Sequence, residues 1–177
     1  MIEEFLSWNI SHELTVVIIS ALPVVELRGA LPVAINLFHM PWHKAFYLAI
    51  IGNLLPVPIL LLFLDSLAKV VSRVEAGRRL VNWVFEHTRR RGKAIEKYEK
   101  IGLTLFVAIP LPITGAWTGS IAAFLLGLRF KYAFISIFIG IIIAGAIVTS
   151  LCLLGWLGAI IAGGGLSALA ILGWRRT

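Results

Sequence analysis

The sequence predicts an all-α polytopic membrane protein with two opposed re-entrant helical hairpins, each followed by a spanning helix. The first reason is composition: the 177 residues are 59% hydrophobic and 14% charged, with a mean hydropathy of +0.95. Soluble domains are about 45–50% apolar and about 25% charged. The second reason is that two long apolar runs are broken near their centres by prolines, and the third is a weak repeat between the two halves. The length corresponds to a single membrane domain, 1–177.

Residues 1–13 are predicted to lie at the membrane interface. They mix apolar side chains with acids, and Trp8 suits the level of the lipid headgroups. The N-terminus lacks the cationic start of a signal peptide, and no small-residue cleavage site follows the first apolar run, so we expect that run to stay in the mature chain.

The apolar run 14–38 carries a carboxylate, Glu26, and a guanidinium, Arg28, at its centre. Ionisable residues at bilayer depth are costly and usually mark substrate or ion pathways. Pro23 and Pro32 bracket the pair, and Gly29 follows it.

These breaks favour a re-entrant hairpin over a straight helix, because each proline removes a backbone donor that lipid cannot replace. We expect residues 14–22 to descend, 23–29 to turn and 30–38 to return. Each arm of about nine residues would be roughly 14 Å long, about half of the bilayer core. A kinked spanning helix is the alternative.

Residues 39–43 are expected to form an interfacial turn anchored by Trp42. His39 and His43 have the i,i+4 spacing of helical metal ligands, but Pro41 lies between them and no third ligand is near, so we expect no metal. Residues 45–64 are long enough for a spanning helix, which contains Asn53 and a kink at Pro56-Val-Pro58.

Residues 65–100 change character, with ten basic residues against five acidic ones. Apolar residues at helical spacing suggest amphipathic helices on the cytoplasmic membrane surface, interrupted near Gly77 and Gly92. Arg89, Arg90 and Arg91 are candidates for contact with anionic lipid. A solvated cytoplasmic loop that only sets topology is the alternative interpretation.

The second apolar run, 101–128, is predicted to be hairpin 2. Its centre is the break Pro110-Leu-Pro112, followed by Gly115 and a stripe of small residues (Gly115, Gly119, Ala123 and Gly127) that would let another helix pack closely. Residues 132–154 are predicted to span the membrane. Residues 155–174 are predicted to form a C-terminal spanning helix.

The two halves match at corresponding positions. Ala21-Leu-Pro23 matches Ala108-Ile-Pro110, Gly29-Ala30 matches Gly115-Ala116, and Ala45-Phe46 with Gly52 matches Ala133-Phe134 with Gly140. Broken segments at corresponding positions of two halves are the best sequence indication of a transporter's binding site.

Charge predicts the orientation. The basic segment 65–100, Arg129 with Lys131, and Arg175-Arg176 should be cytoplasmic by the positive-inside rule, and the N-terminus should lie outside. Hairpin 1 then enters from outside and hairpin 2 from the cytoplasm, and their tips meet near the midplane. The expected location is the inner membrane of a prokaryote.

The predicted substrate or proton site contains Glu26, Arg28, Thr114, Thr118, Asn53 and Trp117. Glu26 and Arg28 should pair, which lowers the cost of burial. Glu26 could then alternate between Arg28 and a proton, and Arg28 could bind an anionic headgroup. The alternative is a fixed ion pair that only holds the hairpin tip. Thr114 could instead cap the second half-helix, and Trp117 could line the site or fill the core.

Glu26-Leu-Arg28-Gly-Ala-Leu-Pro32, together with Pro110-Leu-Pro-Ile-Thr-Gly-Ala-Trp-Thr-Gly119, resembles the small multidrug export proteins of prokaryotes. The resemblance runs from about Pro23 to Gly155. It implies a distant relation to the DedA/VTT membrane proteins, whose fold has two opposed re-entrant hairpins. Those relatives are implicated in moving lipids, including polyprenyl-phosphate carriers, with coupling to protons. This chain carries fewer acidic residues in its first motif than many of them do.

The leading functional hypothesis is a secondary transporter or lipid-type translocase, coupled to protons, with its site at the hairpin tips. The alternatives are an exporter of small hydrophobic cations and a non-transporting membrane scaffold. The expected partners are membrane lipids, an anionic lipid or hydrophobic small molecule as substrate, and protons. A homo-oligomer is compatible with the sequence.

Several classes are not expected. The sequence has no HExxH or Gly-x-Ser-x-Gly motif that would indicate an enzyme, and no cofactor motif. The net charge of +7 is explained by the positive-inside rule, so nucleic-acid binding is not expected. The single cysteine, Cys152, excludes a disulfide framework or cysteine metal cluster within one chain.

Overall fold

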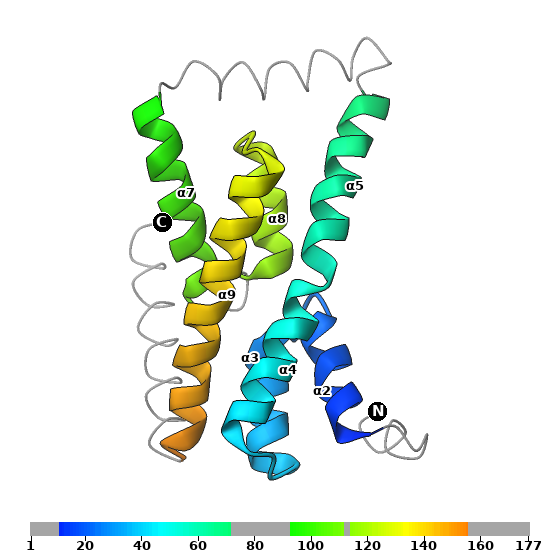
Figure 1. Cartoon of the computed structure of the whole chain (residues 1–177), viewed down its shortest axis with the longest axis vertical. Helices are drawn as coiled ribbons and strands as arrows, with labels where there is room; N and C mark the ends of the chain where they lie inside the picture. Colours follow the sequence, from blue (N-terminus) through cyan, green and yellow to red (C-terminus); the bar gives the residue numbers. More distant parts are fainter. Residues whose placement is uncertain (1–10, 72–92, 112–113, 156–177) are drawn as a thin grey trace, which may run out of the picture.

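Two pairs of short helices pack against two long helical segments (Figure 1). The computed structural model describes residues 11–71, 93–111 and 114–155, and these residues contain helices and turns but no strand. The elements are α2 (His12–Ala21), α3 (Glu26–Pro32), the π-helical turn η1 (Val33–Leu37), α4 (Trp42–Leu54), α5 (Pro56–Val71), α7 (Lys93–Ala108), α8 (Ala116–Leu125) and α9 (Phe130–Leu153). The all-α prediction is confirmed for this part of the chain.

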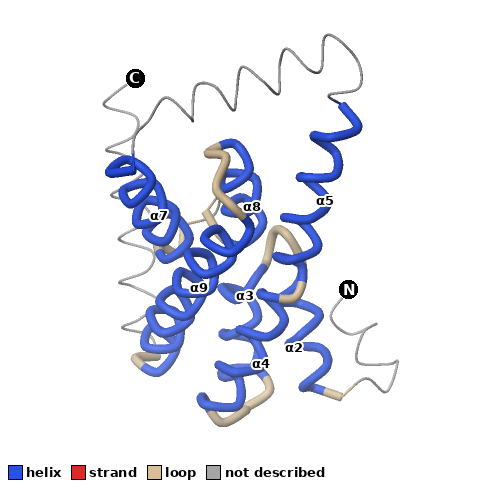
Figure 2. The backbone as a smooth tube through the Cα atoms, turned by 45° about the horizontal axis from the view of Figure 1, so that its top comes forward, coloured by secondary structure: helices blue, strands red, loops and turns tan. Residues whose placement is uncertain are grey.

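The two helix pairs approach from opposite ends of the molecule. The pair α2–α3 occupies the lower half of Figure 1, the pair α7–α8 occupies the upper half, and both turns lie near the middle. Figure 2 shows the same arrangement from a second direction. Helix α2 packs on α4 and α7 packs on α9, whereas α3 also packs on α9 and α8 packs on α5. Each pair therefore contacts the long helices of both halves.

Of the described residues, two segments are long and apolar enough to cross a membrane: Trp42–Leu64 and Phe130–Leu153. They coincide with the predicted spans 45–64 and 132–154. Helix α9 buries mainly small residues together with Ile137 and Ile141, and it exposes an isoleucine every four residues on another side (Ile135, Ile139, Ile143 and Ile147). A continuous row of exposed isoleucines is unfavourable in water, so this row indicates a side of the helix that faces lipid.

The first long segment breaks between α4 and α5, within the predicted proline kink. The Leu55 N–H still donates to the Ile51 carbonyl at 3.1 Å, and Pro56 occupies the first position of α5, where a missing N–H costs least. Pro56 and Pro58 have no N–H to donate, so the carbonyls of Gly52 and Leu54 lose their usual helical partners.

The first turn is shorter than predicted. We expected a turn over 23–29, but α2 ends at Ala21 and α3 already begins at Glu26. The Glu26 N–H bonds the Leu22 carbonyl at 3.1 Å, and the Gly29 N–H bonds the Val25 carbonyl at 3.2 Å. These bonds close helical turns immediately after the proline, so the two charged residues lie in the first turn of a helix.

Two glycines allow the helices to cross closely. A Cβ at Gly52 of α4 would overlap the Val17 carbonyl of α2 and lie 2.9 Å from the Ser20 Cβ. The Ser20 hydroxyl donates to the Ala49 carbonyl at 2.5 Å across this crossing. A Cβ at Gly140 of α9 would lie 2.9 Å from the Thr104 carbonyl oxygen of α7. Both crossings thus depend on backbone approach.

The small-residue stripe of α8 serves three purposes. Gly119 packs against the Val107 side chain of α7, as expected for a helix contact. Gly127, at φ 64°, ends the helix, with the N–H groups of Gly127 and Leu128 bonded to the carbonyls of Phe124 and Ala123. This is a Schellman motif, which favours glycine because of the positive φ. Gly115 is described with the site below.

Some predictions lie outside the described residues. These are the interfacial segment up to residue 10, most of the basic segment with Arg89, Arg90 and Arg91, Pro112, and the C-terminal segment beyond Gly155.

We predict that Gly52→Ala and Gly140→Ala each lower the free energy of unfolding by about 1–3 kcal/mol, the usual cost of overpacking a close contact. The added methyl group meets backbone atoms at both positions, so the helices must separate. Thermal or denaturant unfolding of the purified protein in detergent measures the loss.

Gly102→Ala is the matched control, because a Cβ at this position in α7 meets nothing within 4 Å. It should raise stability by up to about 1 kcal/mol through helix propensity. Equal effects at all three glycines would contradict the assignment of Gly52 and Gly140 to close crossings.

Candidate functional site

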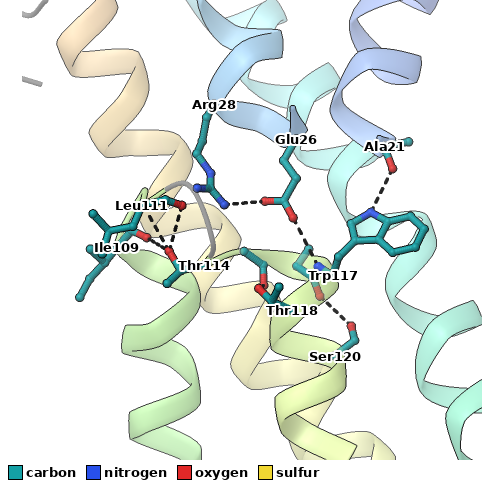
Figure 3. A network of polar contacts seen from close by, with 11 residues as sticks. Ala21, Glu26, Arg28, Ile109, Leu111, Thr114, Trp117, Thr118 and Ser120 are labelled. Carbon is teal, nitrogen blue, oxygen red and sulfur yellow. Dashed lines mark hydrogen bonds and ion pairs between the residues drawn. The ribbon is translucent and has the colours of Figure 1, made fainter. Parts of the chain in front are cut away.

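The turn between α2 and α3 lies against the N-terminus of α8, and two hydrogen bonds join them (Figure 3). The backbone N–H of Trp117 donates to Glu26 Oε1 at 3.4 Å. The indole Nε1–H of Trp117 donates to the Ala21 carbonyl at 3.1 Å. One residue of α8 thus contacts both sides of the first turn.

Glu26 is held in an unusual position. Its side chain is almost fully buried, with 3% of the residue exposed, and its φ of 50° lies in the left-handed region. Residues other than glycine are uncommon there, and the conformation costs on the order of 1–3 kcal/mol. Surrounding contacts must therefore hold the carboxylate in place.

Those contacts make Glu26 the cap of a helix in the other half of the chain. The N-cap of α8 is Gly115, and no side chain of the same segment caps the helix. The backbone N–H of Trp117 instead donates a hydrogen bond to the Glu26 carboxylate. The first N–H groups of a helix lack intrahelical partners and favour negative charge. The carboxylate supplies both the acceptor and the charge.

Gly115 provides the space for this cap. A Cβ at position 115 would overlap the carboxylate of Glu26. The φ of Gly115 is 167°, which is extended backbone that any residue adopts. The absence of a side chain is therefore needed for the close approach of Glu26 and not for the conformation of the turn.

Arg28 forms the ion pair that we predicted. Its Nη2 lies 3.1 Å from Glu26 Oε2, and its side chain is 18% exposed. Its other terminal nitrogen, Nη1, is buried and has no hydrogen-bond partner. The guanidinium has five N–H donors, so the contact with Glu26 through one nitrogen leaves donor capacity unused.

Trp117 satisfies a helix end in the opposite direction. The Ala21 carbonyl belongs to the last turn of α2, where carbonyl groups lack intrahelical donors. The indole of α8 supplies one of the missing donors. Each helix pair thus completes a helix terminus of the other.

The remaining predicted site residues differ in their roles. Thr118 lies in the first turn of α8, where its hydroxyl is 3.5 Å from the Gly115 carbonyl. Thr114 does not cap α8, so that interpretation is wrong. Its hydroxyl accepts from the Leu111 N–H at 3.2 Å and donates to the Ile109 carbonyl at 2.5 Å. It closes the turn that precedes the helix.

Asn53 is buried on α4, with 1% of the residue exposed. Its Oδ1 has no hydrogen-bond partner, and no hydrogen bond links Asn53 to Glu26 or Arg28 among the contacts of the described residues. Five of the six predicted site residues thus lie near the two turns: Glu26, Arg28, Thr114, Trp117 and Thr118. Asn53, the sixth, has no hydrogen bond to this group.

The predicted tip residues shape the two turns. Pro23 is exposed in the turn after α2, and a Cβ at Gly29 would overlap the Val25 side chain. Pro32 closes α3, and the wider π-helical turn η1 follows it. Pro110 lies just after the end of α7, in the second turn. No hydrogen bond joins these four residues to the side chains of Glu26 and Arg28.

The main-chain groups that join the two turns were not predicted from the sequence. The Trp117 N–H, which bonds Glu26, and the Ala21 carbonyl, which accepts from the Trp117 indole, have no side-chain signature. The available indication was the start of a helix at Gly115-Ala-Trp117 after a proline-rich break, because such a start exposes unpaired N–H groups.

We predict that Gly115→Ala destabilises the protein by about 1 kcal/mol, the typical cost of losing an N-cap. The new methyl group displaces the flexible end of Glu26 from α8. Glu26→Ala should remove the same cap. The two losses should therefore not add in the double variant, as expected for residues that share one interaction. Unfolding of the two single variants and the double variant in detergent tests this. Strictly additive losses would show that position 115 acts independently of Glu26.

The comparisons with known proteins give one finding. A family described as "Putative small multi-drug export protein" matches residues 26–147, from the buried carboxylate to the lower part of α9. No curated protein and no solved structure matches the chain. The matched region covers more than half of the sequence and includes both turns, so the chain belongs to the small multi-drug export protein family.

Proposed function

We propose that the chain is an integral membrane secondary transporter or lipid-type translocase, with its substrate site where the two turns meet. The observation that carries this proposal is the Glu26–Arg28 pair on α3, whose buried carboxylate also accepts a hydrogen bond from the start of α8. Membership of an export family supports transport over catalysis. Ionisable residues buried in membrane proteins commonly mark such pathways.

The proposal includes two re-entrant hairpins related by an inverted repeat. Support comes from the opposite directions of α2–α3 and α7–α8 (Figure 1). Further support comes from the crossings: Gly52 meets Val17 and Ser20, and Gly140 meets Thr104 and Val107. Gly52 and Gly140 are at corresponding positions of the two halves. In both halves the glycine meets residues that precede it by nearly the same number of positions in the sequence. Inverted repeats of this kind place binding sites near the bilayer midplane.

The orientation follows from charge. Arg129 and Lys131 stand at the start of α9, on the same side as Lys100 of α7, and we place this side in the cytoplasm. The opposite end, with the Glu13–Lys44 ion pair, then faces outward. The membrane would be the inner membrane of a prokaryote.

Proton coupling would act through Glu26. Charge-assisted hydrogen bonds are roughly twice as strong as neutral ones, so a proton on Glu26 weakens both its bond to Arg28 and its cap on α8. Weakening these bonds would let the two hairpins move relative to each other. The charged side chain in contact with Glu26 among the described residues is Arg28.

The cation exporter is the second candidate, and the family description is the observation in its favour. A lone carboxylate would suit a hydrophobic cation. The Glu26 carboxylate, however, already accepts hydrogen bonds from Arg28 and from the start of α8. We therefore rank this function below the first.

We predict that Glu26→Gln abolishes the effect of a pH gradient on transport by the full chain in vesicles. The assay follows two probes: fluorescently labelled phosphatidylglycerol, whose movement between leaflets is read by chemical quenching, and ethidium, whose uptake is read by fluorescence. With the wild-type chain, the labelled lipid should move faster under a pH gradient. With Glu26→Gln, the rates with and without the gradient should be equal, because the amide cannot exchange a proton in this range.

Glu13→Gln is the matched control. Glu13 lies outside the two spanning segments and pairs at 2.7 Å with Lys44 in the first turn of α4; this ammonium group lowers the pKa of Glu13 to about 2. A lowered pKa keeps Glu13 ionised as pH falls until about 2, so it does not titrate in the assay. The cation exporter would be favoured if the wild-type chain moved ethidium but not the labelled lipid under the gradient, and if Glu26→Gln lost the ethidium movement. Unchanged coupling in Glu26→Gln would contradict the role given to Glu26.

A further inference from the structure

We propose that the ligand of this site is an anion, and that the Glu26 carboxylate occupies the anion's place as a tethered substitute. The inference rests on the proposed function and specifies the substrate class for the same site. It predicts that the anion and Glu26 compete for the same donors.

The first argument is the set of groups around the carboxylate. Glu26 is held by the Arg28 guanidinium and by the backbone N–H of Trp117 at the start of α8 (Figure 3). A guanidinium beside a helix N-terminus is a donor set suited to a carboxylate or a phosphate. A buried carboxylate, with 3% of the residue exposed, already occupies this set. The donors are thus shown to hold an anionic group.

The second argument is the balance of donors and acceptors. Each oxygen of the Glu26 carboxylate already accepts a hydrogen bond, one from Arg28 and one from α8. Arg28, in contrast, has its Nη1 buried without any partner. An unsatisfied buried donor costs free energy, and a ligand with acceptor oxygens would recover it. The site therefore lacks an acceptor rather than a donor.

The third argument is charge. Helix α8 carries no ionisable side chain, and the other charged pair of this half, Glu13 and Lys44, lies at the outer ends of α2 and α4. On α9, Lys131 is in the first turn, far along the helix from the level of the turns. Without Glu26, the described groups at the junction would be the Arg28 cation and the positive end of α8. A cation would be repelled there.

Space for the anion is the space that the Glu26 carboxylate fills. Because Gly115 has no side chain, a carboxylate can approach the start of α8 closely. If Glu26 withdraws, the position that its carboxylate leaves is bordered by the Arg28 guanidinium and the Trp117 N–H. An incoming anion would then form the Arg28 contact and the α8 cap that Glu26 formed before.

Competition has an unusual consequence for mutagenesis. When a site is blocked in most molecules, the apparent dissociation constant is the intrinsic value divided by the open fraction. Removing the charge of Glu26 should therefore strengthen ligand binding, whereas removing an ordinary binding residue weakens it. Removing Arg28 should weaken it in either case.

The chemistry does not separate a lipid headgroup from a free anion, so the test includes both. The full chain in uncharged detergent is titrated by calorimetry with three probes. They are decyl phosphate, inorganic phosphate, and decyltrimethylammonium as a cation with the same tail. The variants are Glu26→Gln, Arg28→Gln and the control Glu13→Gln. Thermal unfolding confirms that each is folded.

We expect decyl phosphate to bind Glu26→Gln about tenfold more tightly than the wild-type chain, if Glu26 blocks the site in roughly nine molecules of ten. Binding should be lost in Arg28→Gln and unchanged in Glu13→Gln. If inorganic phosphate follows the same order, the ligand is a free anion. If decyl phosphate alone does so, the ligand is an amphiphile such as a lipid. If Glu26→Gln does not fold, Glu26→Asp provides the same test, because its shorter side chain reaches α8 less well.

Three results would overturn the proposal. They are anion binding to the Glu26 variant that is no tighter than to the wild type, anion binding that persists in Arg28→Gln, or decyltrimethylammonium binding that the Glu26 variant loses. The assay measures binding without a gradient or transport. If the binding results contradict the proposal but the labelled lipid still moves under a gradient in vesicles, the anion inference is refuted and the transport function is not. Binding as expected without any movement would refute the transport function alone.

Discussion

The structure depends on how helices that end inside the molecule satisfy their terminal backbone groups. A helix that ends at a membrane surface can use water, whereas one that ends within the hydrocarbon layer must find partners in the protein. Helix α2 ends and α8 begins near the middle of the molecule (Figure 1). Trp117 donates to the Ala21 carbonyl, and Glu26 accepts from the start of α8. Neither helix pair could end there without the other.

The energies explain why this junction contains a charged pair. The left-handed conformation of Glu26 costs on the order of 1–3 kcal/mol, and one helix cap returns only about 1 kcal/mol. The cap alone therefore does not compensate for the strain and the burial of a carboxylate. Removing Arg28 would leave the buried carboxylate without a compensating charge, which typically costs about 3–5 kcal/mol. Arg28, two residues further along α3, is thus needed for Glu26 to cap α8.

The broad features of the fold could be predicted from the sequence because they follow from composition and spacing. Apolar length located the segments Trp42–Leu64 and Phe130–Leu153, and the charges within an apolar run identified Glu26 and Arg28. The start of α3 at Glu26 could not be predicted, because a positive φ in a glutamate depends on contacts made far along the chain. The role of Thr114 was misjudged for a related reason. A threonine hydroxyl can bond to several nearby backbone groups, and only the turn geometry selects Ile109 and Leu111.

The two turns are similar in position but different in chemistry, and this difference suggests how the molecule could move. The indole bond from Trp117 to Ala21 joins two neutral groups and responds to neither protons nor anions. The contacts of Glu26 involve charge, so a proton on Glu26 or a competing anion at Arg28 would weaken them. In the proposed mechanism, the Glu26 bond to α8 would be the link that is switched, and the Trp117 bond to Ala21 would stay as a pivot. If the chain transports its ligand, the step that releases the two halves begins at Glu26.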